Sequence, residues 1–416
     1  MIKRKLFKSL KKHLKQKEIT LLVGPRQAGK TTLLLMLKEY LAKRGEKTVF
    51  FNLDIEDDRR YFHSQTEFLN KVKLEIGENE GFIFIDEIQQ KENAGIFLKG
   101  IYDMNTIYKF IVSGSGSVEL KEKIHESLTG RKRLFELTTL SFEEFVNFKT
   151  NYAYEDKLKD FFTIDKDKVN ILLKEYLNFG GYPRVVLESR LEEKRLLINE
   201  IYKSYIEKDI SYLLKVKKAD TFSNLVRLLA SQTGKITNYN ELSSNLGLAH
   251  VTLREYLHHL EKTFIIRRIS PFFKNIKKEI RRAPVFYFYD LGLRNFSVSE
   301  FGNLYEREAA AFVFQNFVCN ILIEKIENTG ARLFFWRTKD KAEVDFVIDR
   351  GLEQIPIEVK FQRLKFPKIS IALRNFIKRY QPEKAYIVNL ELRETLEIKK
   401  TKVFFIPYTM LLFEKF

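Results

Sequence analysis

The sequence predicts an α/β fold of several domains, and three observations carry that prediction. Residues 19–41 read as a short apolar strand, a glycine-containing loop and a helix. Residues 81–87 form an apolar run that ends in two acidic residues, which is typical of a buried parallel strand at a ligand-binding edge. Residues 343–360 hold two short stretches in which polar and apolar side chains alternate, as in paired strands. The chain of 416 residues is too long for one ordinary core, so we expect about two to four domains.

The first observation concerns phosphate binding. Residues 24–31 fit the pattern G-x-x-x-x-G-K-[ST] at every fixed position, between the strand and the helix. Such a loop points backbone N–H groups and the positive end of the helix dipole at one spot. Lys30 would neutralise the β- and γ-phosphates, and the Thr31 hydroxyl would ligate Mg2+. The sequence therefore predicts a nucleoside triphosphate site, with the binding residues Gly24, Pro25, Arg26, Gln27, Ala28, Gly29, Lys30, Thr31 and Thr32.

The acidic pair completes this site. Asp86 and Glu87 end an apolar run at the edge of the sheet where the phosphates would lie. We expect Asp86 to hold Mg2+ through water, and Glu87 to orient and deprotonate the attacking water. Ser113 follows another strand-like run and is the candidate to contact the γ-phosphate or the lytic water. The alternative for Ser113 is an ordinary serine–glycine turn.

Two arginines stand before a further strand-like run at 134–137. An arginine in that position can reach the nucleotide of a neighbouring subunit and stabilise charge in the transition state. Arg131 is the first candidate for this role and Arg133 the second, and the alternative for either is a basic surface residue. A role in trans would imply a homo-oligomer.

Together these motifs resemble a family of prokaryotic AAA+ ATPases that fuse the ATPase to a winged helix and a C-terminal domain of restriction-endonuclease-like fold. The resemblance covers nearly the whole chain and rests on residues 24–32, 86–89, 113–115, 128–131, 140–145 and the lid-like segment 178–183. It implies ATP as the nucleotide, which no motif specifies by itself. We expect four parts: a P-loop AAA+ ATPase domain at 1–150 with a parallel sheet, a helical lid at 151–215, a winged helix at 216–290, and a PD-(D/E)XK nuclease-like α/β domain at 291–416.

The middle of the chain has a helical pattern. Apolar residues recur at helical spacing over 157–215, which suits a lid over the nucleotide, with Arg184 as a candidate phosphate contact. Residues 222–260 predict helices separated by a glycine turn, and two strands follow within 264–290 around a basic connection. This order predicts a winged helix that contacts DNA, although such folds also dock proteins. The candidate DNA contacts are Thr252, Arg254, Lys274, Lys277, Lys278, Arg281 and Arg282.

The C-terminal stretches predict a second site. Residues two apart on a strand share a face, so Glu343 projects with Asp345, and Glu358 with Lys360. Pairing the strands gathers Asp345, Glu358 and Lys360 as in PD-(D/E)XK nucleases, to which this segment is similar. The carboxylates would bind Mg2+, and Lys360 would polarise the lytic water or steady the phosphorane charge. The alternative is a salt-bridged sheet edge. An acid from an earlier helix often completes such sites, and the candidates are Glu306 and then Glu308.

Composition narrows the partners. The formal charge of +18 and a pI of about 9.5 favour a polyanion, for which DNA is the usual choice. The alternative is a composition rich in both Lys and Glu, as in thermophiles. No apolar run reaches the roughly 18 to 20 residues that span a bilayer. The basic start lacks an apolar signal core, and the single Cys319 excludes an internal disulfide, so we expect a cytoplasmic protein without membrane contact.

Two hypotheses of different classes follow. The first is a DNA-processing enzyme that couples an ATP- and Mg2+-dependent AAA+ motor or switch to phosphodiester cleavage or DNA binding. The second is a non-cleaving ATP-dependent switch that binds a partner protein or DNA through the winged helix and a degenerate nuclease-like domain. A transcription regulator would need base-reading side chains, of which the third predicted helix offers few beyond His250, Thr252 and Arg254.

Overall fold

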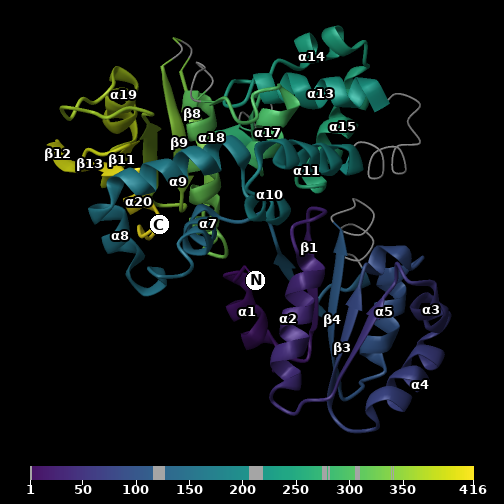
Figure 1. Ribbon diagram of the computed structural model, residues 1–416. Coiled ribbons are helices and arrows are strands. Elements are labelled where there is room, and N and C mark those ends of the chain that lie inside the picture. The colour runs from purple at the N-terminus through teal and green to yellow at the C-terminus, as the bar shows by residue number, and fades with distance from the viewer. Residues whose placement is uncertain are drawn as a thin grey trace.

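The computed structural model describes residues 2–115, 127–205, 219–273, 279, 282–304, 310–338, 340 and 342–416. Its strands form two sheets (Figure 1). A parallel sheet is built from the N-terminal part of the chain, and a mixed sheet is built from the C-terminal part. Helices from the middle of the chain form a layer beside the C-terminal part. None of the described helices is both long and apolar enough to cross a membrane.

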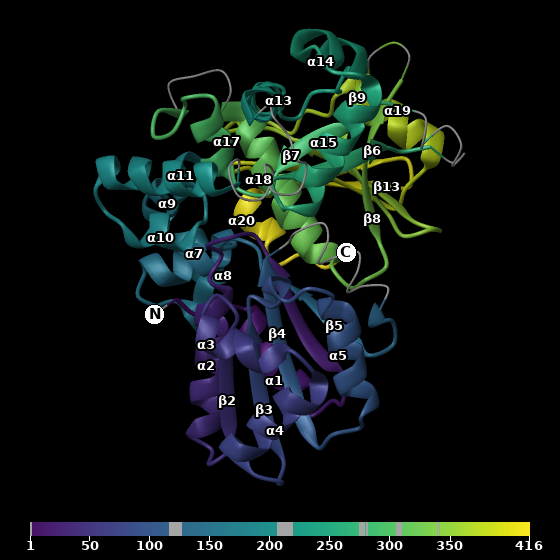
Figure 2. The same cartoon turned by 90° about the vertical axis from the view of Figure 1, so that its right-hand side faces the viewer.

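The N-terminal unit is a parallel sheet covered by helices on both faces. Its elements are α1 (Leu6–His13), β1 (Ile19–Gly24), α2 (Lys30–Ala42), β2 (Thr48–Asn52), α3 (Glu56–Arg59), α4 (Gln65–Ile76), β3 (Gly81–Asp86), α5 (Ala94–Asp103), β4 (Tyr108–Ser115) and β5 (Lys132–Glu136). The strand order is β2-β3-β4-β1-β5, and all pairs are parallel, so the carboxyl ends of β1, β3 and β4 meet at one edge (Figure 2). Leu22 and Phe84 pack with α1 and α2, whereas Val23 and Ile85 pack with α4 and α5.

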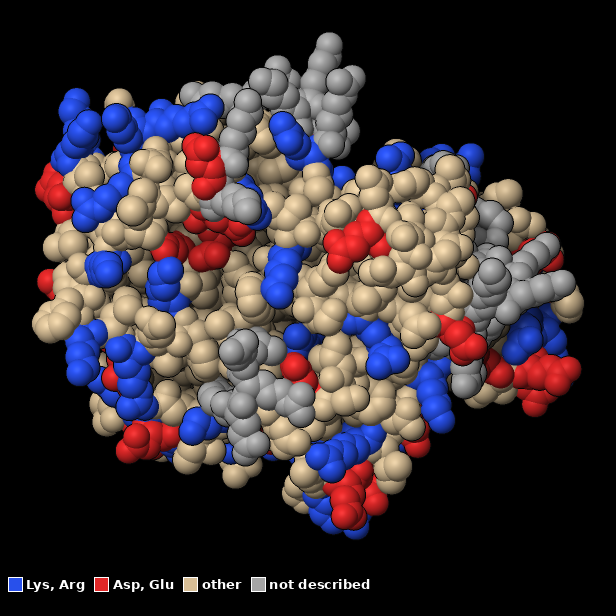
Figure 3. Space-filling view, turned by 90° about the horizontal axis from the view of Figure 1, so that it is seen from above, with Lys and Arg blue, Asp and Glu red and all other residues tan. Residues whose placement is uncertain are grey.

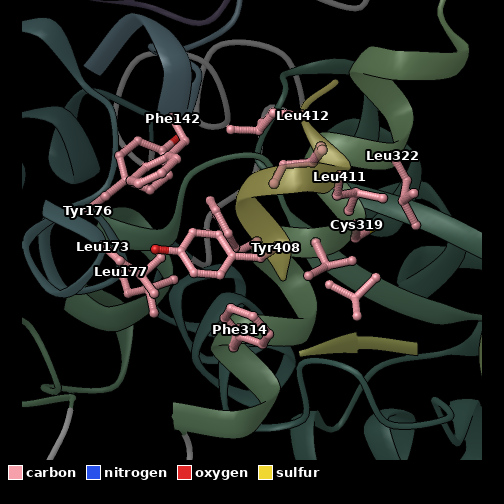
Figure 4. Packing of buried hydrophobic residues seen from close by; sticks show 14 of the residues in the cluster. Phe142, Leu173, Tyr176, Leu177, Phe314, Cys319, Leu322, Tyr408, Leu411 and Leu412 are labelled. Atoms are coloured by element: carbon pink, nitrogen blue, oxygen red, sulfur yellow. The ribbon is translucent and has the colours of Figure 1, made fainter. Parts of the chain in front are cut away.

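The helical layer comprises α7 (Phe142–Lys149), α8 (Leu158–Ile164), α9 (Lys166–Phe179), α10 (Pro183–Leu187) and α11 (Leu191–Ser204). A capping box that begins at Ser141 starts α7. Phe142 of α7 and Tyr176 of α9 pack against Phe317 of α18 (Ala310–Ile326). Phe142 also packs against Tyr408 of α20 (Tyr408–Leu411), as Figure 4 shows. The segment that we expected to form a lid therefore shares a hydrophobic core with the C-terminal part.

A three-helix unit follows, formed by α13 (Ala219–Ser231), α14 (Tyr239–Leu246) and α15 (His250–Lys262). Asn238 caps α14, and Gly247 ends it in the left-handed conformation, so the predicted helix, glycine turn and helix are present. The antiparallel strands β6 (Ile266–Pro271) and β7 (Val285–Phe288) come next, followed by α17 (Leu291–Ser297). Apolar side chains of this unit pack with those of α11.

The C-terminal sheet is mixed. Its further elements are α18 (Ala310–Ile326), β8 (Arg332–Arg337), β9 (Glu343–Asp349), β10 (Gln354–Val359), α19 (Ile371–Tyr380), β11 (Lys384–Asn389), β12 (Glu394–Ile398), β13 (Thr401–Pro407) and α20 (Tyr408–Leu411). The order is β12-β13-β11-β10-β9-β8-β6-β7, with α18 packed on one face and α19 on the other. Ser270 of β6 pairs in parallel with Phe334 of β8. The sheet thus runs across the domain boundary that we expected at residue 290, because pairing between distant strands leaves no local pattern.

Candidate functional site

The phosphate loop folds around its own lysine. Gly29 has a φ of 93°, a conformation that favours glycine, and α2 begins at the next residue. A Cβ at Gly24 would lie 2.0 Å from the carbonyl oxygen of Leu137, so only glycine fits there. Lys30 is buried, and its Nζ donates to the carbonyl oxygens of Gly24 (3.1 Å) and Pro25 (2.8 Å). The lysine that we expect to meet phosphate is therefore held inside the loop.

Three predicted residues meet beside this loop. The Thr31 hydroxyl donates to Asp86 Oδ2 at 2.5 Å, and the Ser113 hydroxyl donates to Asp86 Oδ1. Asp86 and Ser113 are both buried, near the carboxyl ends of β3 and β4. A hydroxyl and a carboxylate that converge on one point are the hard oxygen donors that Mg2+ takes, so this site fits the ion.

Glu87 stands next to this group in a left-handed backbone conformation, with a φ of 56°. Gln89 Nε2 donates to Glu87 Oε2, and Gln89 Oε1 accepts from the Ser115 N–H at 3.1 Å. Burial raises the pKa of Glu87, opposed by the Gln89 hydrogen bond and the charge of Lys30. Gln89 is therefore a positioning residue that the sequence did not reveal, although it lies two residues after the carboxylate it holds.

Arg4 is a second residue whose role the sequence did not reveal. Its Nη1 donates to the Ala28 carbonyl of the phosphate loop at 2.9 Å, and its Nη2 donates to the Thr138 carbonyl at 2.7 Å. Its Nε pairs with Glu144 of α7 at 3.2 Å, and both side chains are buried. Arg4 thus ties the phosphate loop to the helical layer. In the sequence it is one cation in a basic N-terminal run, a pattern more typical of surface residues.

The predicted arginines lie in different places. Arg184, in α10, donates from Nη1 to Gln27 Oε1 of the phosphate loop at 3.0 Å. Arg131 lies just before β5, near the amino ends of the parallel strands, and its Nε pairs with Asp103 at 2.7 Å. Arg133 is exposed on β5. Within one chain, Arg184 is at the nucleotide site, whereas Arg131 and Arg133 would have to act on a neighbouring copy.

The C-terminal sheet brings together three other predicted residues. Asp345 of β9 lies beside Glu358 of β10 in the antiparallel pair, and its Oδ2 accepts from the Val359 N–H at 2.6 Å. Glu358 is buried, and its Oε1 pairs with Lys360 Nζ at 2.6 Å. We call Asp345, Glu358 and Lys360 the carboxylate cluster.

Two residues that the sequence did not reveal hold this cluster in place. Gln315 Nε2 of α18 donates to Asp345 Oδ1 at 2.6 Å, and the Ser370 hydroxyl donates to Glu358 Oε2 at 2.7 Å. Burial raises the pKa of Asp345 to about 7, and the nearby Glu358 carboxylate adds to the rise. Two close carboxylates in a desolvated position suit a divalent cation, so the cluster fits Mg2+. Gln315 and Ser370 lie outside residues 343–360, so the spacing of the motif could not predict them.

The other predicted residues that the structure describes lie outside the carboxylate cluster. Glu343 pairs with Arg337 at 3.1 Å. Among the residues that the structure describes, no three His, Cys, Asp or Glu side chains are placed to share one metal ion. Arg254 and Arg282 line one groove of the three-helix unit, and Thr252 is half-buried on α15. The described ranges do not include Glu306, Glu308, Lys274, Lys277, Lys278 or Arg281.

Comparison with protein families agrees with a phosphate-binding loop at residues 24–31. Residues 16–146 match a family described as an AAA domain. Residues 170–303 and 310–411 match two domains of unknown function, DUF8612 and DUF4143. The N-terminal part is therefore similar to AAA domains, a class that generally binds ATP and Mg2+.

Relatives and solved structures extend the comparison. The chain is 26% identical over 382 residues to an uncharacterized protein of Mycobacterium tuberculosis, which covers 91% of this chain and 78% of that protein. It is 26% identical over 408 residues to an uncharacterized protein of Methanocaldococcus jannaschii, with 91% and 82% covered. Among solved structures it resembles the Aeropyrum pernix ORC1 protein in complex with DNA (TM-score 0.31, 12% identity, 72% of this chain and 93% of that chain). It also resembles AMPPCP-bound DnaA from Aquifex aeolicus (TM-score 0.27, 17% identity, 62% and 86% covered).

Proposed function

We propose that this protein hydrolyses ATP and processes DNA, with the AAA domain acting as a motor or switch for Mg2+-dependent cleavage or binding of DNA at the carboxylate cluster. The observation that supports this most directly is the presence of two separate cation-competent sites in one basic chain. Thr31 and Asp86 form the first beside the phosphate loop, and Asp345 and Glu358 form the second.

At the first site, the chemistry that we propose is phosphoryl transfer to water. Thr31 and Asp86 would hold Mg2+, which neutralises phosphate charge when bound. Lys30 would exchange its carbonyl partners for phosphate oxygens. Glu87, whose pKa is raised, is a better proton acceptor than an ordinary glutamate. Arg184 would bring a further positive charge from α10 by exchanging Gln27 for phosphate.

At the second site, Asp345 and Glu358 would hold Mg2+, which activates water when bound. Gln315 and Ser370 each occupy one carboxylate oxygen and so fix the orientation of both acids. The Lys360 side chain is 41% exposed, so its ammonium group can leave Glu358 for a phosphate oxygen. These residues together offer the metal ligands and the cation that phosphodiester cleavage needs.

Charge and shape support DNA as the partner. The formal charge is +18, and Arg254 and Arg282 line a groove of the three-helix unit. Helix, turn and helix followed by the β6–β7 hairpin form the winged-helix arrangement. The position of Arg131, away from its own phosphate loop, favours a homo-oligomer in which it serves the next copy.

One observation favours a second candidate function, a non-cleaving switch. In the described part of the chain, no third His, Cys, Asp or Glu side chain is placed to share a metal ion with the two carboxylates of the cluster. A site with two acids can bind DNA or a partner protein without chemistry. In that case ATP would control binding alone.

A cleavage assay tests the proposal. Linear, single-stranded, flapped and branched DNA would be incubated with Mg2+ or Mn2+, with and without ATP. Asp345→Asn keeps the shape of the side chain but loses the charge that holds the metal. Asp349→Asn is the matched control, because Asp349 lies on the same strand and bonds only to its own turn in the contacts that the structure describes.

We expect cleavage by the wild type and by Asp349→Asn, and a loss of about a hundredfold or more in Asp345→Asn, with ATP hydrolysis unchanged. Intact ATP hydrolysis with no cleavage of any DNA would overturn the nuclease part and favour the switch. Absence of ATP hydrolysis would overturn the first site as well.

A further inference from the structure

The turn after α13 reaches the carboxylate cluster. Gly234 in this turn has a φ of 77°, and a Cβ there would lie 2.6 Å from Gln315 Oε1 and 3.0 Å from the ring of Phe312. The amide of Gln315 is the one that donates to Asp345 at 2.6 Å. The three-helix unit and the carboxylate cluster therefore meet at α18, with no room between them for a larger residue at position 234.

An exposed aromatic ring and a cation stand at this meeting point. Phe312 is 37% exposed, and Lys235 Nζ lies 5.1 Å from the centre of its ring. Both residues line a cavity of about 550 Å3 together with Ile236, Arg337 and Glu343. Arg337 pairs with Glu343, so the charge of Glu343 is largely neutralised, and Lys235 adds a positive charge.

This cavity adjoins the groove of the three-helix unit. Ile236 lines both, and the groove of about 1130 Å3 carries Arg254, Arg268 and Arg282 on its walls. Figure 3 looks down on this side of the molecule, where Lys and Arg side chains are spread over the surface and acidic side chains gather in a hollow on the half that carries α19. Cations thus outnumber the two acids of the groove, Glu255 and Glu261, between the three-helix unit and the carboxylate cluster.

The side chains that line the groove and the cavity indicate which kind of ligand they fit. Arginines and lysines along a groove fit a phosphodiester backbone. An exposed ring fits the face of a base, but the bases of a duplex are stacked on each other and offer no free face. Lys235 has a long, exposed side chain, so its ammonium group can leave the Phe312 ring for a phosphate and free the ring for a base.

We propose that a single strand of nucleic acid runs from the groove of the three-helix unit past Ile236 to the carboxylate cluster, with one base stacked on Phe312 and a neighbouring phosphate bound by Lys235. This inference rests on the proposed function, because it supplies the substrate form for the same cluster. It assigns single-stranded DNA or the unpaired end of a duplex as the substrate class.

Binding of fluorescently labelled DNA to the full chain in EDTA tests the path without cleavage. The probes are a single strand, a blunt duplex and a flapped duplex. The variants are Phe312→Ala, Phe312→Trp and Lys235→Gln. The control is Lys43→Gln, which removes an exposed charge just after α2. Anisotropy gives Kd at several salt concentrations.

We expect Phe312→Ala to weaken binding of the single strand about tenfold and of the blunt duplex little, since one stacked base is lost, whereas Phe312→Trp retains binding. Lys235→Gln should weaken single-strand binding and lower the slope of log K against log salt by about 0.7, as for one phosphate contact. Ultraviolet crosslinking of a strand that carries 5-iodouracil should label Phe312.

The two possible failures are distinguishable. If the wild type binds and cleaves DNA but Phe312→Ala and Lys235→Gln behave as Lys43→Gln does, the path is wrong and the proposed function stands. If the wild type binds none of the probes, both are wrong. Crosslinks confined to the AAA domain would also overturn the path.

Discussion

At the scale of single residues, the nucleotide site is organised by hydrogen bonds that fix carboxylates. Asp86 accepts from both Thr31 and Ser113, and Glu87 accepts from Gln89. The oxygen atoms that would meet Mg2+ or water are therefore pre-oriented. Under the proposed function this arrangement would separate two roles: Asp86 would bind the cation, and Glu87 would accept the proton.

Glu87→Gln should keep ATP bound and slow its hydrolysis about a hundredfold or more, because the amide cannot accept the proton of the attacking water. Steady-state phosphate release and binding of a labelled ATP would be measured together. Glu92→Gln, an exposed change in the same loop region, is the control and should hydrolyse ATP as the wild type does. Unchanged hydrolysis in Glu87→Gln would assign the base to another residue.

A buried histidine gives the N-terminal sheet a pH dependence. His13 Nδ1 lies 2.8 Å from Thr20 Oγ1, and Lys109 Nζ lies 3.4 Å from the same ring atom. Burial lowers the pKa of His13 to about 4, and the charges of Lys109 and Arg133 add to this effect against the nearby Glu18. As the pH falls, His13 of the unfolded chain is protonated near its ordinary pKa of 6.5. In the folded chain it is protonated only near pH 4. Stability is therefore present above pH 6.5 and is lost as the pH falls towards 4.

The lowered pKa of His13 predicts that the free energy of unfolding falls by about 2 kcal/mol between pH 8 and pH 5. His13→Asn should not show this fall, since the amide does not titrate. Denaturant unfolding of the full chain at the two pH values, compared between wild type and variant, measures this difference. His63→Asn changes an exposed histidine and should keep the wild-type pH dependence. If the free energy of unfolding changes equally with pH in the wild type and in His13→Asn, His13 is not the source of the pH dependence.

At the scale of elements, the turn between α9 and α10 is a close-packed junction. The Gly181 N–H donates to Asp290 Oδ2 at 2.8 Å, and the Gly181 carbonyl accepts from the Leu140 N–H at 2.8 Å. A Cβ at Gly181 would lie 2.4 Å from the Leu140 carbonyl oxygen. Since α10 begins just after this turn and carries Arg184, the junction fixes α10 beside the phosphate loop.

Gly181→Ala should therefore destabilise the protein by about 1 to 3 kcal/mol, because backbone atoms cannot move aside as a side chain can. Gly100→Ala in α5 is the matched control: its Cβ would meet only the far end of the Gln65 side chain, and alanine is a better helix former than glycine. Thermal unfolding compares the two. Equal melting temperatures would show that the junction opens at little cost.

Local patterns predicted most elements, and long-range contacts decided the rest. The phosphate loop, the strand that ends at Asp86 and the helix, turn and helix at 219–262 all lie in short segments, so spacing and glycines specify them. The pairing of β6 with β8, and the contacts of Arg4 and Gln315, join positions far apart in the chain. The sequence pattern of each such partner is that of an ordinary strand, cation or amide, so none was predicted.

At the scale of the whole molecule, four hydrogen-bonded contacts, joined by short chain segments, connect the two sites. Asp290, which holds Gly181, lies two residues after the end of β7. Phe288 of β7 exchanges two hydrogen bonds of 2.8 Å with the Asn316 side chain of α18. The preceding residue, Gln315, holds Asp345 of the carboxylate cluster. The phosphate loop is joined to this path at its start by Arg184, so a nucleotide that displaces the Arg184 contact acts on the same junction.

This connection predicts that ATP changes amide hydrogen exchange far from its own site. In Glu87→Gln, which should hold ATP without hydrolysis, ATP should change exchange in β7 and in the first turns of α18 by about fivefold or more, as coupling energies of this kind do. Arg184→Ala, added to Glu87→Gln, should abolish the distant change while leaving protection of the phosphate loop, because only the link to α10 is cut.

Arg44→Ala, which removes a cation of the AAA domain that contacts Tyr40, serves as the control and should leave the distant change in place. Exchange in β7 and α18 that is the same with and without ATP would mean that the two sites act independently, and a distant change that survives Arg184→Ala would mean that another contact, of which Arg4 is the nearest, carries the coupling.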